Sequence, residues 1–123
     1  MATQGPALVG IAGVVEGEFI ALQYGESLVM GRSRSCDFSL RNCKRWIEAE
    51  KVGQIPEESS RTVSRRHLKI TYHNANSIEL EDLSSNGTFV DGRRIDRLVI
   101  TDAKETPHEI QLGGGDRLRL EWR

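Results

Sequence analysis

Apolar side chains recur at every second position in many short windows along the chain. Because successive side chains of a strand point to opposite faces of a sheet, this period of two predicts strands with one buried face. Such windows span residues 9–11, 20–24, 28–30, 68–72, 78–80 and 118–122, and shorter apolar windows span 38–40, 89–90, 98–100 and 110–112.

Glycine, asparagine and aspartate separate these windows, as in residues 84–87 (SSNG) and 90–94 (VDGRR). Such residues favour tight turns, and Asn86-Gly87 is a strong signal for a turn between two strands. The three glycines at 113–115 predict a flexible turn. About ten short strands joined by turns predict an all-β fold, an antiparallel β-sandwich or barrel.

Residues 41–63 interrupt the pattern. This segment holds five basic and four acidic side chains and shows no strand alternation. Residues 43–52 consist largely of good helix formers, and Gly53 and Pro56 stand where they would stop a helix. We therefore expect a long, partly helical insertion between two strands, a kind of loop that is often functional.

Composition narrows the class of protein. The 123 residues suit one domain, and we place a tail at residues 1–7 and the domain at residues 8–123. The 17 lysines and arginines nearly balance the 18 aspartates and glutamates, so any attraction for anions must be local. The N-terminus lacks a basic region followed by an apolar stretch, and no run of about eighteen apolar residues occurs, which predicts a cytoplasmic protein.

The two cysteines, Cys36 and Cys43, are too few for a disulfide framework or a structural zinc site. We expect both to be reduced, structural thiols, and we expect neither a metal nor a cofactor.

Three motifs carry candidate chemistry: Gly31-Arg32 at the end of a strand, Ser64-Arg-Arg-His67 at the start of another, and Asn86-Gly87 in a turn. A serine near a histidine fits a nucleophile with its base, and a hydroxyl beside arginines fits a phosphate-binding site. Ser64 and His67 are three positions apart at the entry to a strand, so their side chains leave on opposite faces. This spacing disfavours a catalytic pair.

In this order and on an all-strand background, the three motifs resemble those of the forkhead-associated (FHA) domain, a β-sandwich that reads phosphothreonine. The resemblance extends from about Leu8 to Trp122. It implies a sandwich of about eleven strands, with the peptide site formed by loops at one end.

The resemblance implies a role for each motif residue. Arg32 and Arg65 would supply fixed cations for the phosphate, and the Ser64 hydroxyl would donate to a phosphate oxygen. Ser85 stands where the family carries threonine or serine, and Asn86 would hold the peptide main chain through its side-chain amide. A small pocket for the extra methyl group would favour phosphothreonine over phosphoserine.

Three further residues are implied to be architectural: Gly31 for close backbone packing, His67 for hydrogen bonds between loops, and Gly87 for a positive φ. Loop side chains would read the residues that flank the phosphothreonine. The candidates for this selectivity are Arg34, Lys44, Arg45, Arg93 and Arg94.

The insertion departs from the family, which usually joins these strands by a short loop. We expect Trp46 and Ile47 to anchor it on the sandwich. One alternative is simple packing far from the ligand. The other is a loop that holds Arg41, Lys44 or Arg45 beside the phosphate site and selects acidic peptides.

The predicted function is therefore a non-catalytic module that binds threonine-phosphorylated proteins in kinase-linked signalling. An RNA- or DNA-binding β-domain is the main alternative because arginines cluster locally, although no aromatic side chains interleave with them for base stacking. The sequon that starts at Asn86 leaves a glycosylated extracellular sandwich as a third hypothesis, which the absence of a signal peptide disfavours.

Overall fold

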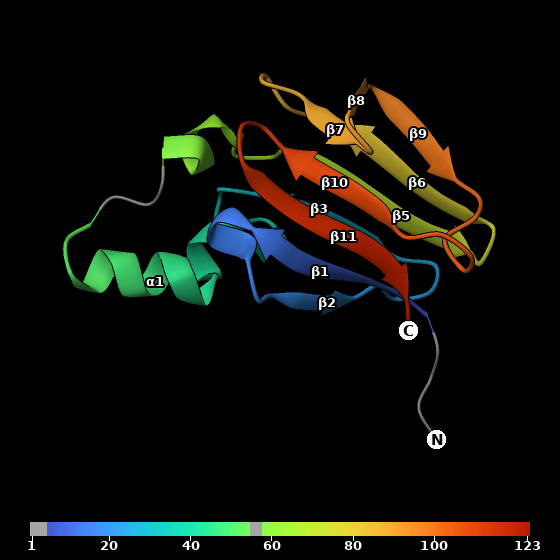
Figure 1. The fold of residues 1–123 in the computed structure, drawn as a ribbon, viewed down its shortest axis with the longest axis horizontal. Helices are drawn as coiled ribbons and strands as arrows, with labels where there is room; N and C mark the ends of the chain where they lie inside the picture. Colours follow the sequence, from blue (N-terminus) through green and yellow to red (C-terminus); the bar gives the residue numbers. More distant parts are fainter. Residues whose placement is uncertain (1–4, 55–57) are drawn as a thin grey trace.

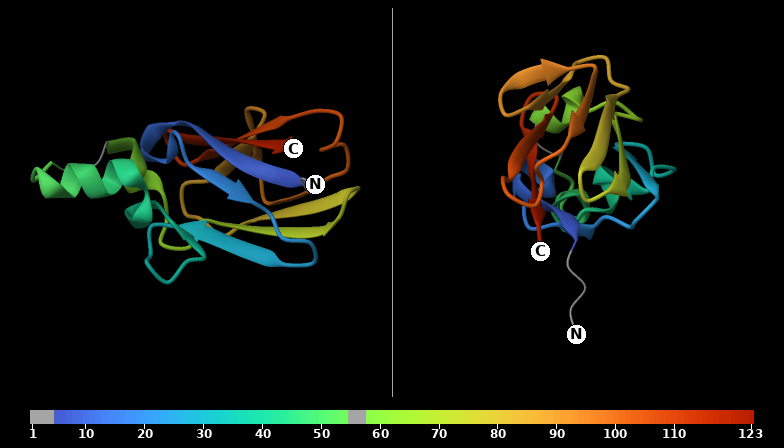
Figure 2. Two further views of the ribbon diagram at one scale, coloured as in Figure 1. Left: turned by 90° about the horizontal axis from the view of Figure 1, so that it is seen from below. Right: turned by 90° about the vertical axis from the view of Figure 1, so that its right-hand side faces the viewer.

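Eleven strands within the described residues form two sheets that pack face to face (Figures 1 and 2). The computed structural model describes residues 5–54 and 58–123. The six-stranded sheet has the order β2 (Phe19–Ala21), β1 (Pro6–Ala12), β11 (Asp116–Trp122), β10 (His108–Leu112), β7 (Thr88–Val90) and β8 (Arg93–Ile95). The five-stranded sheet has the order β4 (Phe38–Ser39), β3 (Ser27–Gly31), β5 (Leu68–Asn74), β6 (Ser77–Asp82) and β9 (Arg97–Ile100). Paired strands are antiparallel apart from the parallel pair β3 and β4, and the predicted all-β sandwich is confirmed.

The core lies between the two sheets and consists of alternate positions on the strands. On β5, Leu68 and Ile70 are 0% and 1% exposed, and on β11 both Leu118 and Leu120 are fully buried. Because these positions are two apart, each strand points one row of apolar side chains inward, as the windows predict. Burial of these rows away from water is the main favourable contribution to folding.

β1 only half-buries the two predicted inward positions of its window, Val9 and Ile11. Val9 is half-buried, whereas Leu8 and Gly10 are buried. A Cβ atom on Gly10 would lie 1.6 Å from the carbonyl oxygen of Val15, because the 3-10 helix η1 (Gly13–Val15) packs directly on the β1 backbone. Glycine has no apolar side chain to count, so the apolar pattern selected the less buried positions of this strand.

β8 is a strand that the apolar windows miss. Asp91 and Gly92, with φ of 51° and 84°, form the predicted turn, and the chain then continues as β8 and pairs with β7. Two of its three residues are arginines, so it carries no period-two signal.

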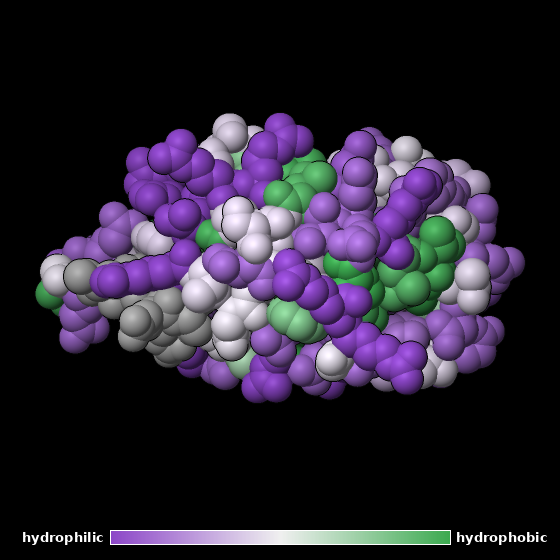
Figure 3. Space-filling view, turned by 90° about the horizontal axis from the view of Figure 1, so that it is seen from above, coloured by the Kyte–Doolittle hydropathy of each residue, from purple (hydrophilic) through white to green (hydrophobic). Residues whose placement is uncertain are grey.

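β8 and β9 are edge strands, and Figure 3 shows hydrophobic side chains among hydrophilic ones on the face that carries them. Charged side chains on an edge strand hinder pairing with another chain.

The predicted insertion contains one short α-helix. α1 spans Lys44–Lys51, only eight residues, between the 3-10 helices η2 (Leu40–Asn42) and η3 (Glu58–Thr62), so a long helical insertion would overstate it. Gly53 follows the helix with φ of 70°, as the predicted stop requires. Pro56, the second predicted stop, lies outside the described residues.

Trp46 holds α1 on the sandwich. Its side chain is 8% exposed and belongs to the hydrophobic core together with Cys43, whereas Ile47 is 42% exposed. Of the two predicted anchors, only Trp46 is therefore buried. α1 contacts η1 and extends beyond the sheets at one end of the molecule (Figure 2).

Cys36 and Cys43 are free and buried, which confirms the prediction of reduced structural thiols. Burial raises the pKa of the Cys43 thiol to about 12, so this thiol stays protonated at neutral pH.

The two ends of the described chain pair with each other. The Gly5 N–H donates to the carbonyl oxygen of Arg123 at 2.6 Å, and the Arg123 N–H donates back to Gly5 at 2.8 Å. β1 begins at Pro6, just ahead of the predicted domain start at residue 8. Within the part of the chain that the structure describes, no helix has the length and apolar character needed to span a bilayer.

Candidate functional site

The segment after β3 and the segment before β5 run side by side at one end of the sandwich. The Arg32 N–H donates to the carbonyl oxygen of Ser64 at 3.0 Å, and the Ser33 N–H donates to that of Arg65 at 3.1 Å. A Cβ atom on Gly31 would lie 2.2 Å from the Arg65 oxygen and 2.8 Å from the Ser64 oxygen. A side chain at position 31 would therefore separate the two segments that carry the candidate phosphate ligands.

His67 joins the same segment to the loop between β6 and β7. The imidazole is fully buried, and its Nδ1 accepts the Ser64 N–H at 3.0 Å. Nε2 must then carry the hydrogen, and it donates to the carbonyl oxygen of Gly87 at 2.8 Å. Burial lowers the pKa of His67, although the bond to Gly87 and the nearby Asp82 act in the opposite direction, so the ring is neutral. Both ring nitrogens are thus occupied by backbone groups.

Ser64 is arranged to donate its hydroxyl hydrogen. Its Oγ accepts the Ser85 N–H at 3.0 Å, and the imidazole of His67 contacts the Ser64 backbone rather than this hydroxyl. An accepting hydroxyl keeps its own O–H available to a ligand oxygen. The arrangement therefore suits anion binding and lacks a nucleophile paired with a base.

Arg32 and Asn86 are each fixed by one bond and keep other donors. The Arg32 Nε donates to the carbonyl oxygen of Val63, which leaves the terminal N–H groups of the guanidinium. The Asn86 Nδ2 donates to the carbonyl oxygen of Thr62 at 2.8 Å, which leaves one amide hydrogen and the amide oxygen. Each side chain is positioned before a ligand arrives.

The Asn86-Gly87 turn is held by a network centred on Asp82. Asp82 Oδ1 accepts from the Ser84 hydroxyl at 2.6 Å and from the Thr88 hydroxyl at 2.9 Å, and the Ser84 Oγ accepts the Gly87 N–H at 2.8 Å. Burial raises the pKa of Asp82, but these hydrogen bonds outweigh it and the net pKa is lowered, so the carboxylate is ionised at neutral pH. Gly87 has φ of 101°, as the turn prediction requires.

Guanidinium groups gather beside these loops. A hollow of about 330 Å³ is lined by Arg32, Ser33, Arg34, Arg41 and Arg65. Within residues 5–54 and 60–123, none of these four arginines forms an ion pair with a carboxylate. The molecule has a net charge of -1, so this concentration of positive charge is local, as the composition requires.

Comparison with known proteins identifies the family. The sequence matches the model of the FHA domain over residues 28–120. The chain belongs to the FHA domain family. This match confirms the resemblance to the FHA domain that the three motifs indicate. FHA domains are phosphopeptide-recognition modules and are generally non-catalytic.

Solved FHA domains share the fold. The FHA domain of the CT664 protein from Chlamydia trachomatis is 23% identical, with a TM-score of 0.68 and coverage of 98% of this chain and 100% of that chain. The N-terminal FHA domain of Rad53p from S. cerevisiae, in complex with a phosphothreonine peptide, is 15% identical, with a TM-score of 0.64 and coverage of 97% and 94%. A structure from a study of phosphothreonine-dependent FHA domain interactions is 25% identical, with a TM-score of 0.65 and coverage of 97% and 96%. Among curated proteins, no relative matches the sequence.

The selectivity candidates of this FHA domain lie in different places. Arg34 lines the hollow, and Arg94 lies over the turn, where a Cβ atom on Gly87 would be 3.0 Å from its Nε. Arg93 is exposed on β8. Arg45 turns away and pairs with Glu16 at 2.5 Å. The fifth candidate, Lys44, is exposed on α1, and neither it nor Arg45 lines the hollow.

Thr62 is a site residue that the motifs do not reveal. Besides binding Asn86 through its carbonyl oxygen, it accepts the Gly114 N–H on its Oγ1 at 2.6 Å. A Cβ atom on Gly113 would lie 2.3 Å from that Oγ1. The predicted flexible turn at the three glycines is therefore a close packing contact with the site. Arg41, which lines the hollow, was predicted only in the alternative that places the insertion beside the phosphate site. Ser84 was not predicted, because no motif marks it apart from its place beside Ser85.

Proposed function

We propose that this FHA domain binds threonine-phosphorylated partner proteins in kinase-linked signalling in the cytoplasm, without a catalytic step. The observation that carries the proposal is a positively charged hollow lined by Arg32 and Arg65, with Ser64 directly beside it in the chain and bonded through its carbonyl oxygen to the Arg32 N–H. Arg32 and the Ser64 hydroxyl each keep hydrogen-bond donors for a ligand. A phosphate dianion offers several strong acceptor oxygens and about two negative charges, which match guanidinium and hydroxyl donors. Asn86 would hold the peptide main chain beside it.

The geometry gives nucleic acid less support than a phosphopeptide. Single-stranded nucleic acids bind to grooves that combine basic and aromatic side chains, because each base stacks on a ring. The residues that line the hollow include no aromatic side chain. The preference for phosphothreonine over phosphoserine is part of the same proposal and rests on family resemblance.

Titration of one peptide in three forms tests the proposal. The domain should bind the phosphothreonine form, bind the phosphoserine form more weakly and bind the unphosphorylated form least. Arg32→Ala removes charge-assisted hydrogen bonds worth roughly 2 to 3 kcal/mol, which corresponds to weaker binding by about thirty- to a hundred-fold. Calorimetry or fluorescence anisotropy measures both effects.

Arg119→Ala is the matched control, since Arg119 is an exposed arginine on β11 paired with Glu121 and should leave peptide affinity unchanged. Equal affinity for the phosphorylated and unphosphorylated peptides would reject the proposal. Tighter binding of a single-stranded oligonucleotide than of the phosphopeptide would support the nucleic-acid alternative.

A further inference from the structure

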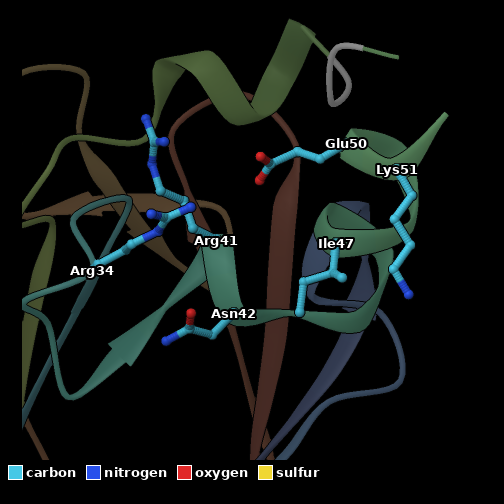
Figure 4. Close-up of a pocket in the computed structure, with 6 residues that line it drawn as sticks. All are labelled: Arg34, Arg41, Asn42, Ile47, Glu50 and Lys51. Carbon is cyan, nitrogen blue, oxygen red and sulfur yellow. The ribbon is translucent and has the colours of Figure 1, made fainter. Parts of the chain in front are cut away.

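The hollow lined by Arg32, Ser33, Arg34, Arg41 and Arg65, called here the phosphate hollow, adjoins a second hollow. The second, of about 470 Å³, is lined by Arg34, Arg41, Asn42, Ile47, Glu50 and Lys51, and it lies between η2 and α1 (Figure 4). Arg34 and Arg41 line both hollows, so the two form one groove that leads from the phosphate site to the insertion.

The positive charge of this groove exceeds what one phosphate needs. Four guanidinium groups line the phosphate hollow, whereas a phosphothreonine phosphate carries about two negative charges at pH 7. Like charges held this close repel one another unless anions offset them. Arg32 and Arg65 match one phosphate, which leaves Arg34 and Arg41 for a second anion.

Arg41 is held in place for such a role. Its backbone N–H donates to the Ser39 hydroxyl at 3.2 Å, which caps η2, and its guanidinium lies 5.4 Å from the ring centroid of the buried Trp46. A cation over an aromatic face is stabilised without losing its charge. Because the side chain is already ordered, a ligand loses less entropy in binding to it. The insertion therefore positions an arginine beside the phosphate site.

The helix side of the groove limits where an anion can lie. Figure 4 shows the Glu50 carboxylate extending from α1 toward Arg41, while the Lys51 side chain points away from both arginines. No ion pair joins Glu50 to either arginine. A carboxylate on this wall would repel a ligand anion placed near α1 and favour one placed between Arg34 and Arg41. The exposed Ile47 offers an apolar contact beside that position.

We propose that Arg34 and Arg41 form a second anion subsite, which takes another anionic side chain of the same phosphopeptide. This inference rests on the proposed function and extends it. The chemistry fits an aspartate or glutamate carboxylate and equally a second phosphate, since guanidinium groups bind both. Preferred partners would carry an acidic or second phosphorylated residue near the phosphothreonine.

The test compares peptide preferences. Parallel peptides carry one phosphothreonine and either neutral neighbours, one aspartate moved a position at a time along both sides, or one phosphoserine at the same positions. The expected result is that the domain binds the best aspartate peptide about threefold to tenfold more tightly than the neutral peptide. A gain for phosphoserine alone identifies a second phosphate as the ligand, and a gain for both identifies any anion.

Three variants assign that preference to the subsite. Arg41→Gln should reduce the ratio of the two affinities to about one, and Glu50→Gln should increase it by about twofold. Arg45→Gln makes the same charge change as Arg41→Gln on the neighbouring helix, but Arg45 pairs with Glu16 and lines neither hollow, so the ratio should stay at the wild-type value.

Two results would overturn the inference while leaving the proposed function intact. One is phosphothreonine-dependent binding with no preference for a second anion at any position. The other is an equal loss of preference in Arg41→Gln and Arg45→Gln, which would indicate a general effect of net charge. Failure of the proposed function looks different, because no peptide would then show any dependence on phosphothreonine.

Discussion

Ser64 and His67 contribute to the site through different atoms. The Ser64 hydroxyl accepts the Ser85 N–H and keeps its own O–H as a donor, whereas His67 connects two loops through both ring nitrogens and has no exposed surface. Substitution of the two residues should therefore separate binding from stability.

Ser64→Ala should weaken phosphopeptide binding by about tenfold and lower the free energy of unfolding by at most about 1 kcal/mol, since water can replace its bond to the exposed Ser85 N–H. His67→Ala leaves buried backbone groups unpaired and creates a cavity, so the free energy of unfolding should fall by about 2 to 4 kcal/mol. Chemical denaturation and peptide titration of both variants measure these effects. The opposite pattern, an unstable Ser64→Ala and a stable His67→Ala that fails to bind, would reverse the two roles.

At single positions, the sequence predicted the residues whose chemistry is local. Arg32, Ser64 and Asn86 lie on loops that contact one another, as the motif order predicts. The Arg32 N–H bonds the Ser64 carbonyl oxygen, and Asn86 bonds the Thr62 carbonyl oxygen two residues before Ser64. Thr62 was missed because its contacts, with Asn86 and Gly114, depend on how distant loops pack. No spacing along the chain records that packing.

At the scale of secondary-structure elements, the packing of α1 on the sandwich depends on the side chain of Trp46. Trp46→Ala should lower the free energy of unfolding by about 2 to 4 kcal/mol, because it removes a large side chain from the core and leaves a cavity. Ile47→Ala is the matched control on the same helix, and since Ile47 is 42% exposed its cost should stay below about 1 kcal/mol. Denaturant unfolding of both variants checks the difference. Equal costs would show that Trp46 does not anchor α1.

Strand prediction succeeded where one face carries large apolar side chains and failed elsewhere. β5 and β11 match their windows because each buries a full apolar row. β8 was missed because it is a three-residue edge strand held by pairing with β7, and its arginines need no buried face. The more buried positions of β1 were missed because Gly10 takes an inward position for reasons of space. Backbone pairing and close approach leave little trace in a hydrophobic pattern.

Over the whole molecule, His67 and His108 make the free energy of unfolding depend on pH in opposite directions. His108 bonds Asp91 through Nδ1 at 2.6 Å and Asp102 through Nε2 at 2.7 Å. Partial burial lowers the pKa of His108, but the two carboxylates raise it by more, so its net pKa lies above 6.5. Burial holds the pKa of His67 below 6.5. The stability from His108 is thus complete below pH 6.5 and is lost as the pH rises through its raised pKa.

His67 changes stability with pH in the opposite direction to His108. Below pH 6.5 the unfolded chain takes up a proton at this residue while the folded domain does not, so stability is lost as the pH falls toward the folded pKa. The summed contribution of the two residues should have a maximum near pH 6.5. Denaturant unfolding across the pH range measures it.

His108→Gln should remove the decline on the alkaline side of the maximum and lower stability at pH 6.5 by about 0.5 to 1 kcal/mol, a value reduced for the partial exposure of both carboxylates. The decline on the acidic side should persist in this variant. An unchanged alkaline slope in His108→Gln would show that the contacts with Asp91 and Asp102 do not set it.

The pairing of Gly5 with Arg123 brings the two ends of the described chain to one place on the domain. β11 has seven residues, from Asp116 beside the glycine turn at the site to Trp122 near the chain end. At about 3.3 Å per residue, the strand separates the two by about 20 Å. A fluorophore or sensor surface coupled at Arg123 would therefore lie about 20 Å along β11 from the glycine turn, away from the peptide groove.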